Sequence, residues 1–80
     1  MEEADLKRLL WRCRRGTREL DIILERFVRH VYSDLPNEEK ELFDQLLDKQ
    51  DPILNEWFYQ AVIPQDQGMA KIVKRILSTD

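Results

Sequence analysis

The chain has 80 residues, with 16 acidic and 13 basic side chains and a net charge of -3. A chain of this length forms one domain and buries only about 60 to 65% of the surface that it exposes when unfolded, so its core cannot enclose a cofactor-sized pocket of roughly 300 to 1,000 Å³. The acidic balance argues against nucleic acid or an anionic membrane as a partner of the whole molecule.

Cysteine usage and the start of the chain suggest a cellular location. Cys13 is the only cysteine, which excludes an internal disulfide and fits a reducing compartment. No apolar run approaches the roughly 20 residues that a membrane-spanning helix needs. The first stretch, MEEADLKRLL, is acidic where a targeting signal would be basic. We therefore expect a cytoplasmic protein without direct membrane insertion.

The first predicted helix covers residues 5–15, because its apolar residues recur at the spacing of one helical face. Cys13 lies on this face, and we expect it to be buried. Gly16 stands where the helix should stop, and we expect it to act as a left-handed cap. The opposite face should be exposed, and it is made of basic residues around one aromatic ring: Lys7, Arg8, Trp11, Arg12, Arg14 and Arg15.

The next two helices have clear start signals. Thr17 is the predicted N-cap of the second helix, whose apolar stripe runs from Leu20 to Val31. A third helix should open near Pro36 or Asn37, with acidic residues in its first turn.

The remaining chain predicts two more helices. Asp51 is the expected N-cap of a short fourth helix with Pro52 at its first position, and this helix should end before Pro64. The stretch IPQDQG is a predicted loop. The fourth helix should place Leu54, Trp57, Phe58 and Ala61 on one apolar face, and the fifth should run to Ser78 on Met69, Ile72, Val73, Ile76 and Leu77. Since no segment alternates with period two, we expect an all-α fold, a compact bundle of about five short helices, in one helical domain over residues 1–80.

The sequence offers no set of groups for catalysis. His30 is the only imidazole, Cys13 faces the expected core, and no glycine-rich phosphate loop exists. We therefore expect neither enzymatic activity nor a metal site. Residues 37–61 superficially suggest a DNA-reading helix-turn-helix, but the second helix is acidic and aromatic, so we expect no nucleic-acid binding.

The basic cluster around Gly16 leaves two interpretations open. Arginine and tryptophan are enriched at binding hot spots, and clustered guanidinium groups suit a partner surface rich in carboxylates. A solvated basic face is the alternative. Asp21 is well explained as a favourable charge in the first turn of a helix, whereas Glu19 lies beside Gly16, where a partner has easy access.

The stretch RRGTRELD contains an R-G-x-x-E motif made of Arg15, Gly16 and Glu19. Together with the upstream WRC, the later EEKELFDQLL and DPILNEW, and the terminal helix, it resembles the succinate dehydrogenase assembly factors, the small FAD assembly factors. The resemblance covers nearly the whole chain in register.

This resemblance implies a five-helix protein that binds the flavoprotein subunit of succinate dehydrogenase, and in some bacteria of fumarate reductase, and promotes covalent attachment of FAD. The chemistry and the FAD then belong to the client, with no cofactor held stably by this chain, which we expect to be a monomer. An antitoxin that acts by protein binding is the alternative. Arg15, Gly16 and Glu19 match the motif, and the implied partner-binding surface adds Arg8, Trp11 and Asp21.

Overall fold

The computed structural model describes residues 3–78 of the chain. In this range lie α1 (Glu3–Arg12), α2 (Arg18–His30), a short 3-10 helix η1 (Tyr32–Asp34), α3 (Asn37–Leu47), α4 (Asp51–Tyr59) and α5 (Gln67–Leu77). The described residues contain no strand, and the prediction of an all-α bundle is confirmed. None of these helices is long and apolar enough to cross a membrane.

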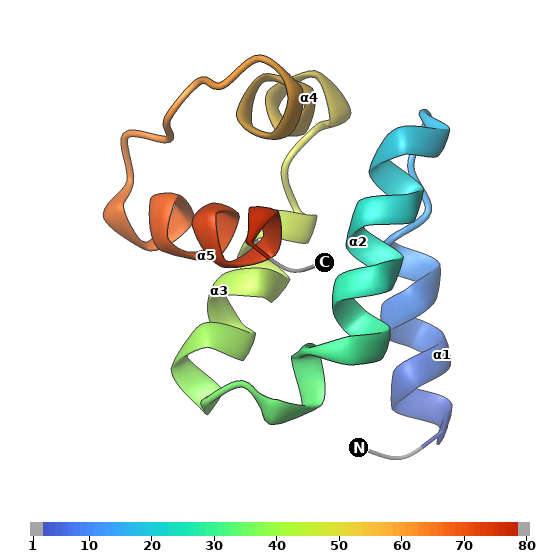
Figure 1. Ribbon diagram of the computed structural model, residues 1–80. Helices are drawn as coiled ribbons and strands as arrows, with labels where there is room; N and C mark the ends of the chain where they lie inside the picture. Colours follow the sequence, from blue (N-terminus) through green and yellow to red (C-terminus); the bar gives the residue numbers. More distant parts are fainter. Residues whose placement is uncertain (1–2, 79–80) are drawn as a thin grey trace.

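Helix α2 is the central element of the bundle. It runs antiparallel beside α1, and the other helices lie on its far side (Figure 1). It also packs against α4 and α5, while α5 packs against α3 and α4. This arrangement gathers α1, α2 and the start of α4 around the connection between α1 and α2.

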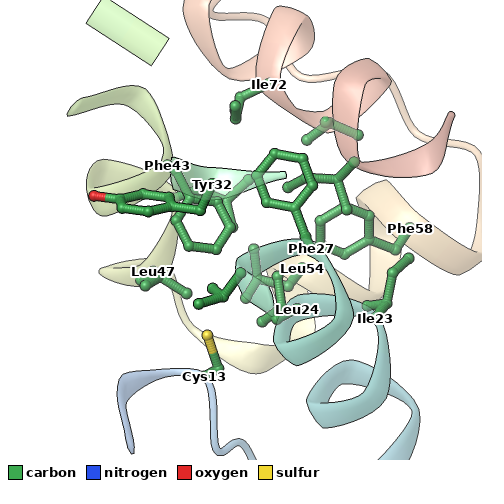
Figure 2. Close-up of a cluster of buried hydrophobic side chains, with 14 of the residues drawn as sticks. Cys13, Ile23, Leu24, Phe27, Tyr32, Phe43, Leu47, Leu54, Phe58 and Ile72 are labelled. Atoms are coloured by element: carbon green, nitrogen blue, oxygen red, sulfur yellow. The ribbon is translucent and has the colours of Figure 1, made fainter. Parts of the chain in front are cut away.

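The core forms around the apolar face of α2. Leu20, Leu24 and Phe27 are fully buried, which confirms the face predicted for this helix. Phe27 stacks at a tilt against Phe43 of α3, with 5.1 Å between the ring centroids (Figure 2). Cys13 points into the same cluster, so its expected burial is confirmed.

The first helix ends at Arg12, so its predicted extension to Arg15 is wrong. The amide of Cys13 still bonds to the carbonyls of Leu9 and Leu10, but the chain then leaves the helix. Gly16 is not the expected left-handed cap, since no glycine among residues 3–78 has a positive φ. The physical reason is that carboxylates from other parts of the chain, described below, accept hydrogen bonds from the amides of this turn.

Two predictions for the fourth helix are wrong. Gln50 is the N-cap and Asp51 is the first helical residue, so the Asp51 carboxylate is not used as a cap within α4. Ala61 lies beyond the end of the helix, exposed, with φ of 58°. The left-handed turn at Ala61 lets the amide of Val62 bond back to the carbonyl of Glu56, which closes the helix.

Other helix signals agree with the structure. Thr17 stands at the N-cap position of α2 as predicted, although its side chain makes no capping hydrogen bond, and α3 opens directly after Pro36. Helix α5 begins at Gln67, earlier than its apolar pattern indicates, because the Asp66 side chain accepts a hydrogen bond from the Met69 amide at 2.9 Å. Leu77 was expected in the core but is 49% exposed in the last turn.

Candidate functional site

The corner between α1 and α2, residues Cys13 to Thr17, carries the first part of the R-G-x-x-E motif. Two successive amides of this corner donate to carboxylates. The Arg15 amide donates to Oδ1 of Asp21 in α2, and the Gly16 amide donates to Oδ2 of Asp51 in α4 at 2.6 Å. The path of the corner is therefore set by side chains from two other parts of the chain.

The guanidinium group of Arg15 faces inward across the corner. Its Nη2 atom donates to the carbonyl of Leu47 at 2.8 Å and to that of Lys49 at 2.6 Å. Its Nε lies 3.2 Å from Oδ1 of Asp51 as an ion pair, although the N–H is not aligned for a hydrogen bond. The side chain is only 14% exposed. Arg15 thus ties the corner to the carbonyl end of α3, a location that favours a cation.

Arg12 holds α1 to α3 in a similar way. Its Nη2 atom donates to the carbonyl of Asp44 at 3.0 Å and to Oδ1 of Asp48 at 3.1 Å. The expected exposed basic face is therefore wrong for Arg12 and Arg15, which serve contacts within the chain. Spacing along α1 could not reveal this, because the acceptors are more than thirty positions away in the sequence, at separations of 32 to 36.

Gly16 lies directly against the Asp51 carboxylate. A Cβ placed there would lie 2.9 Å from Oδ2 of Asp51. Such a contact is too close for a carbon and an oxygen, so any side chain must displace the carboxylate. Gly16 permits the close approach of Asp51, and its own surface stays exposed.

Glu19 lies exposed in the first turn of α2. Its carbonyl accepts a hydrogen bond from the Tyr59 hydroxyl at 2.9 Å. Partial burial, and after it the Glu19 carboxylate, raise the pKa of Tyr59. The Glu19 carboxylate itself has no hydrogen bond or ion pair to the described part of the chain, so it is available to an external donor.

The remaining predicted residues fall on two sides of α1. Trp11 is 69% exposed, and the Arg14 guanidinium lies 5.4 Å from its ring centroid. Trp11, Arg14 and Asp21 line an open hollow of about 350 Å³ between α1 and α2. Arg8 instead lines a smaller hollow on the side of α1 that faces α3. The structure therefore groups Trp11 with the corner and places Arg8 apart from it.

Asp51 is the residue of this site that sequence reasoning missed. The sequence predicts a role for the aspartate of DPILNEW only as the cap of the fourth helix. The sequence does show an aspartate directly before Pro52, at the start of a helix. A carboxylate at such a position can also accept a hydrogen bond from a neighbouring segment. Only the fold places it against Gly16.

Cys13, His30 and the acidic side chains of residues 3–78 are the candidates for metal-binding and nucleophilic arrangements. The described residues contain no group of three or more His, Cys, Asp and Glu side chains arranged to hold a metal ion. Burial raises the pKa of Cys13 to about 12, so its thiol is protonated and a poor nucleophile at neutral pH. His30 is exposed near the end of α2.

Sequence comparison identifies relatives of the whole chain. The family model described as "flavinator of succinate dehydrogenase" matches residues 7–80. A protein of Coxiella burnetii named FAD assembly factor SdhE is 46% identical over 70 residues, which span 88% of this chain and 85% of the relative. Proteins of the same name from Shewanella oneidensis and Yersinia pseudotuberculosis are each 41% identical, covering 95% and 98% of this chain and 93% and 89% of the relatives. The chain therefore belongs to the family of succinate dehydrogenase flavinators.

Proposed function

We propose that this chain is an FAD assembly factor, which binds the flavoprotein subunit of succinate dehydrogenase and promotes covalent attachment of FAD to that subunit. The observation that carries the proposal is the exposed pair Gly16 and Glu19 on a corner held in place by Arg15, Asp21 and Asp51. Family membership supports this function over the antitoxin alternative.

In this proposal the exposed residues meet the client and the inward residues maintain the shape of the corner. Gly16 lets the client backbone come close, and the unpaired Glu19 carboxylate accepts hydrogen bonds from client donors. Trp11, with Arg14 beside it, extends the surface with an aromatic anchor of a kind frequent at binding hot spots. Arg15 acts from within by fixing the corner, instead of pairing with client carboxylates.

The chemistry of flavin attachment belongs to the client. The assembly factor contributes by holding the client in a conformation in which FAD and the acceptor side chain meet, and such positioning can lower a barrier by several kcal/mol without any reacting group on the helper. We further propose that the factor is a cytoplasmic monomer without enzymatic activity of its own, and that fumarate reductase can serve as a second client.

We also propose that the isolated chain does not bind free FAD stably. The hollow beside Trp11 is open to solvent and lined by charges of both signs, such as Arg14, Asp21 and Glu25. Titration calorimetry with free FAD should therefore give no saturable heat in the low micromolar range. A one-to-one complex below about 1 µM, equivalent to roughly 8 kcal/mol, would contradict this part of the proposal.

The test of function is a reconstitution with purified apo flavoprotein subunit and FAD. Covalent flavin is followed by its fluorescence on a denaturing gel, with and without this chain. Wild type should accelerate attachment, and Glu19→Ala should lose most of this effect, because truncation at the centre of an interface typically costs about 2 kcal/mol or more.

Glu38→Ala is the matched control, since Glu38 is also an exposed glutamate in the first turn of a helix. It should leave flavin attachment unchanged, and circular dichroism should show both variants folded. If Glu19→Ala supports attachment as well as Glu38→Ala does, the corner is not the docking site. If wild type has no effect on attachment, the proposed function itself fails.

A further inference from the structure

Helix α4 contacts the R-G-x-x-E stretch at both of its ends. At its start, Asp51 binds the Gly16 amide and lies beside the Arg15 guanidinium. At its end, the Tyr59 hydroxyl binds the carbonyl of Glu19. One short helix thus contacts all three motif positions, Arg15, Gly16 and Glu19, although it lies far from them in the sequence.

We propose that Asp51 is a positioning residue for client binding, which holds Gly16 and Arg15 in the shape that the client recognises. This inference rests on the proposed function, because it concerns how the same corner is prepared for the flavoprotein subunit. Asp51 acts through its neighbours and need not touch the client.

The division of the Asp51 carboxylate supports this role. Oδ2 accepts from Gly16 at 2.6 Å, and Oδ1 lies 3.2 Å from Nε of Arg15. Both partners are contributed by the corner, and the N-cap of α4 is Gln50 instead of Asp51. With Asp51 truncated, the Gly16 amide has no acceptor in the chain, whereas Arg15 keeps the carbonyls of Leu47 and Lys49. The corner would then be free to sample other backbone conformations while the helices stay packed.

Gly16 and Asp51 are also coupled sterically. A methyl group at position 16 would lie 2.9 Å from Oδ2 of Asp51, and no other atom is within 4 Å of that point except the immediate backbone neighbours. Gly16→Ala must therefore push the carboxylate away, and this cost disappears when the carboxylate is absent. If the glycine served only the approach of the client, the two substitutions would act independently.

The first experiment compares Asp51→Ala and Asp51→Asn with Asp48→Ala. Asp48 is an exposed aspartate of the same turn that contacts Arg12 instead of the corner. Affinity for the apo flavoprotein subunit is measured by surface plasmon resonance, and hydrogen exchange of the Gly16 amide is measured by NMR on the free chain. Asp51→Ala should weaken binding about tenfold or more and speed up exchange at Gly16.

Asp51→Asn tests the same idea with an isosteric side chain. Its amide oxygen can still accept from Gly16, so it should restore part of the exchange protection and part of the affinity, whereas Asp48→Ala should match wild type in both measurements. If Asp51 only stabilised the fold, its variants would change the melting temperature, but their affinities for the client would not follow the exchange protection of the Gly16 amide. Wild-type affinity in Asp51→Ala, with its Gly16 amide exposed to exchange, would overturn the proposal.

A double-mutant cycle supplies the second experiment. Gly16→Ala alone should weaken client binding, and in the Asp51→Ala background the added methyl should weaken it by a clearly smaller factor, because only its contact with the client remains. Independent, multiplicative effects would overturn the coupling.

The outcomes also separate this inference from the proposed function. If wild type binds no flavoprotein subunit, the function fails, and Gly16 exchange in the free variants still tests whether Asp51 holds the corner. If wild type binds and Asp51→Ala binds equally well, only the positioning role fails.

Discussion

Two connections of this chain reverse its direction in different ways. The corner from Cys13 to Thr17 is held by directional, charge-assisted contacts from α2, α4 and the end of α3. In the connection between α4 and α5, residues 61–65 are held by one backbone hydrogen bond, from the Val62 amide to the carbonyl of Glu56, and by burial of Pro64. Ile63 in this connection is 79% exposed.

The difference concerns how narrowly each shape is specified. Hydrogen bonds to charged groups depend strongly on distance and direction, so the corner has one favoured arrangement. Apolar contacts are non-directional, so they specify the shape of the α4–α5 connection less narrowly, and this connection borders an apolar hollow together with Trp57 and the side of α5. A recognition site benefits from the first kind of support, because less ordering is then required on binding.

Removing the Arg15 side chain should break the corner most severely. Arg15→Ala loses charge-assisted bonds to two carbonyls and the ion pair with Asp51, and we expect about 2 to 3 kcal/mol lower free energy of unfolding. Arg15→Lys should recover little, because one ammonium group cannot span the same acceptors. Urea unfolding followed by circular dichroism measures both.

Arg14→Ala is the matched control, since Arg14 is the exposed neighbour and should alter stability by less than about 0.5 kcal/mol. Equal stability of the Arg14 and Arg15 variants would show that the corner is held no more tightly than an ordinary surface turn.

High pH should lower the free energy of unfolding, because the thiol of Cys13, at the start of the corner, is buried. Burial raises the pKa of Cys13 from 9.0 to about 12, so the unfolded chain loses this proton first. The stability contributed by the neutral thiol is therefore full below pH 9 and is lost as pH rises toward 12, by about 2 kcal/mol near pH 10.5. Chemical unfolding between pH 8 and 10.5 should show a steeper decline for wild type than for Cys13→Ala. Parallel pH profiles for the two proteins would contradict the assignment.

An alanine-to-glycine substitution in the α4–α5 connection should stabilise the protein, although the same substitution within a helix destabilises it. Ala61 has a φ of 58°, which is unfavourable for a residue with a Cβ. Ala61→Gly should raise the free energy of unfolding by up to about 1 kcal/mol, whereas Ala70→Gly within α5 should lower it by a similar amount. Thermal melts of the two variants give the signs, and a destabilised Ala61→Gly would mean that the turn carries no strain.

Local signals in the sequence were sufficient for the helices. The apolar stripe of α2 and the proline before α3 act within a few residues, so periodicity and capping rules apply to them directly. Helix ends were less accurate, as at Arg12 and Ala61, because backbone groups there bond to acceptors that local patterns do not reveal.

By itself, the sequence determined the all-α class, the central apolar helix and the motif of Arg15, Gly16 and Glu19. Only the tertiary structure decided that Arg15 faces inward and that Asp51 meets Gly16, across a separation of 35 positions. The physical reason is that an arginine or aspartate carries the same charge on a solvated surface as in an internal contact. Which of the two it becomes depends on the groups that packing brings within hydrogen-bonding distance.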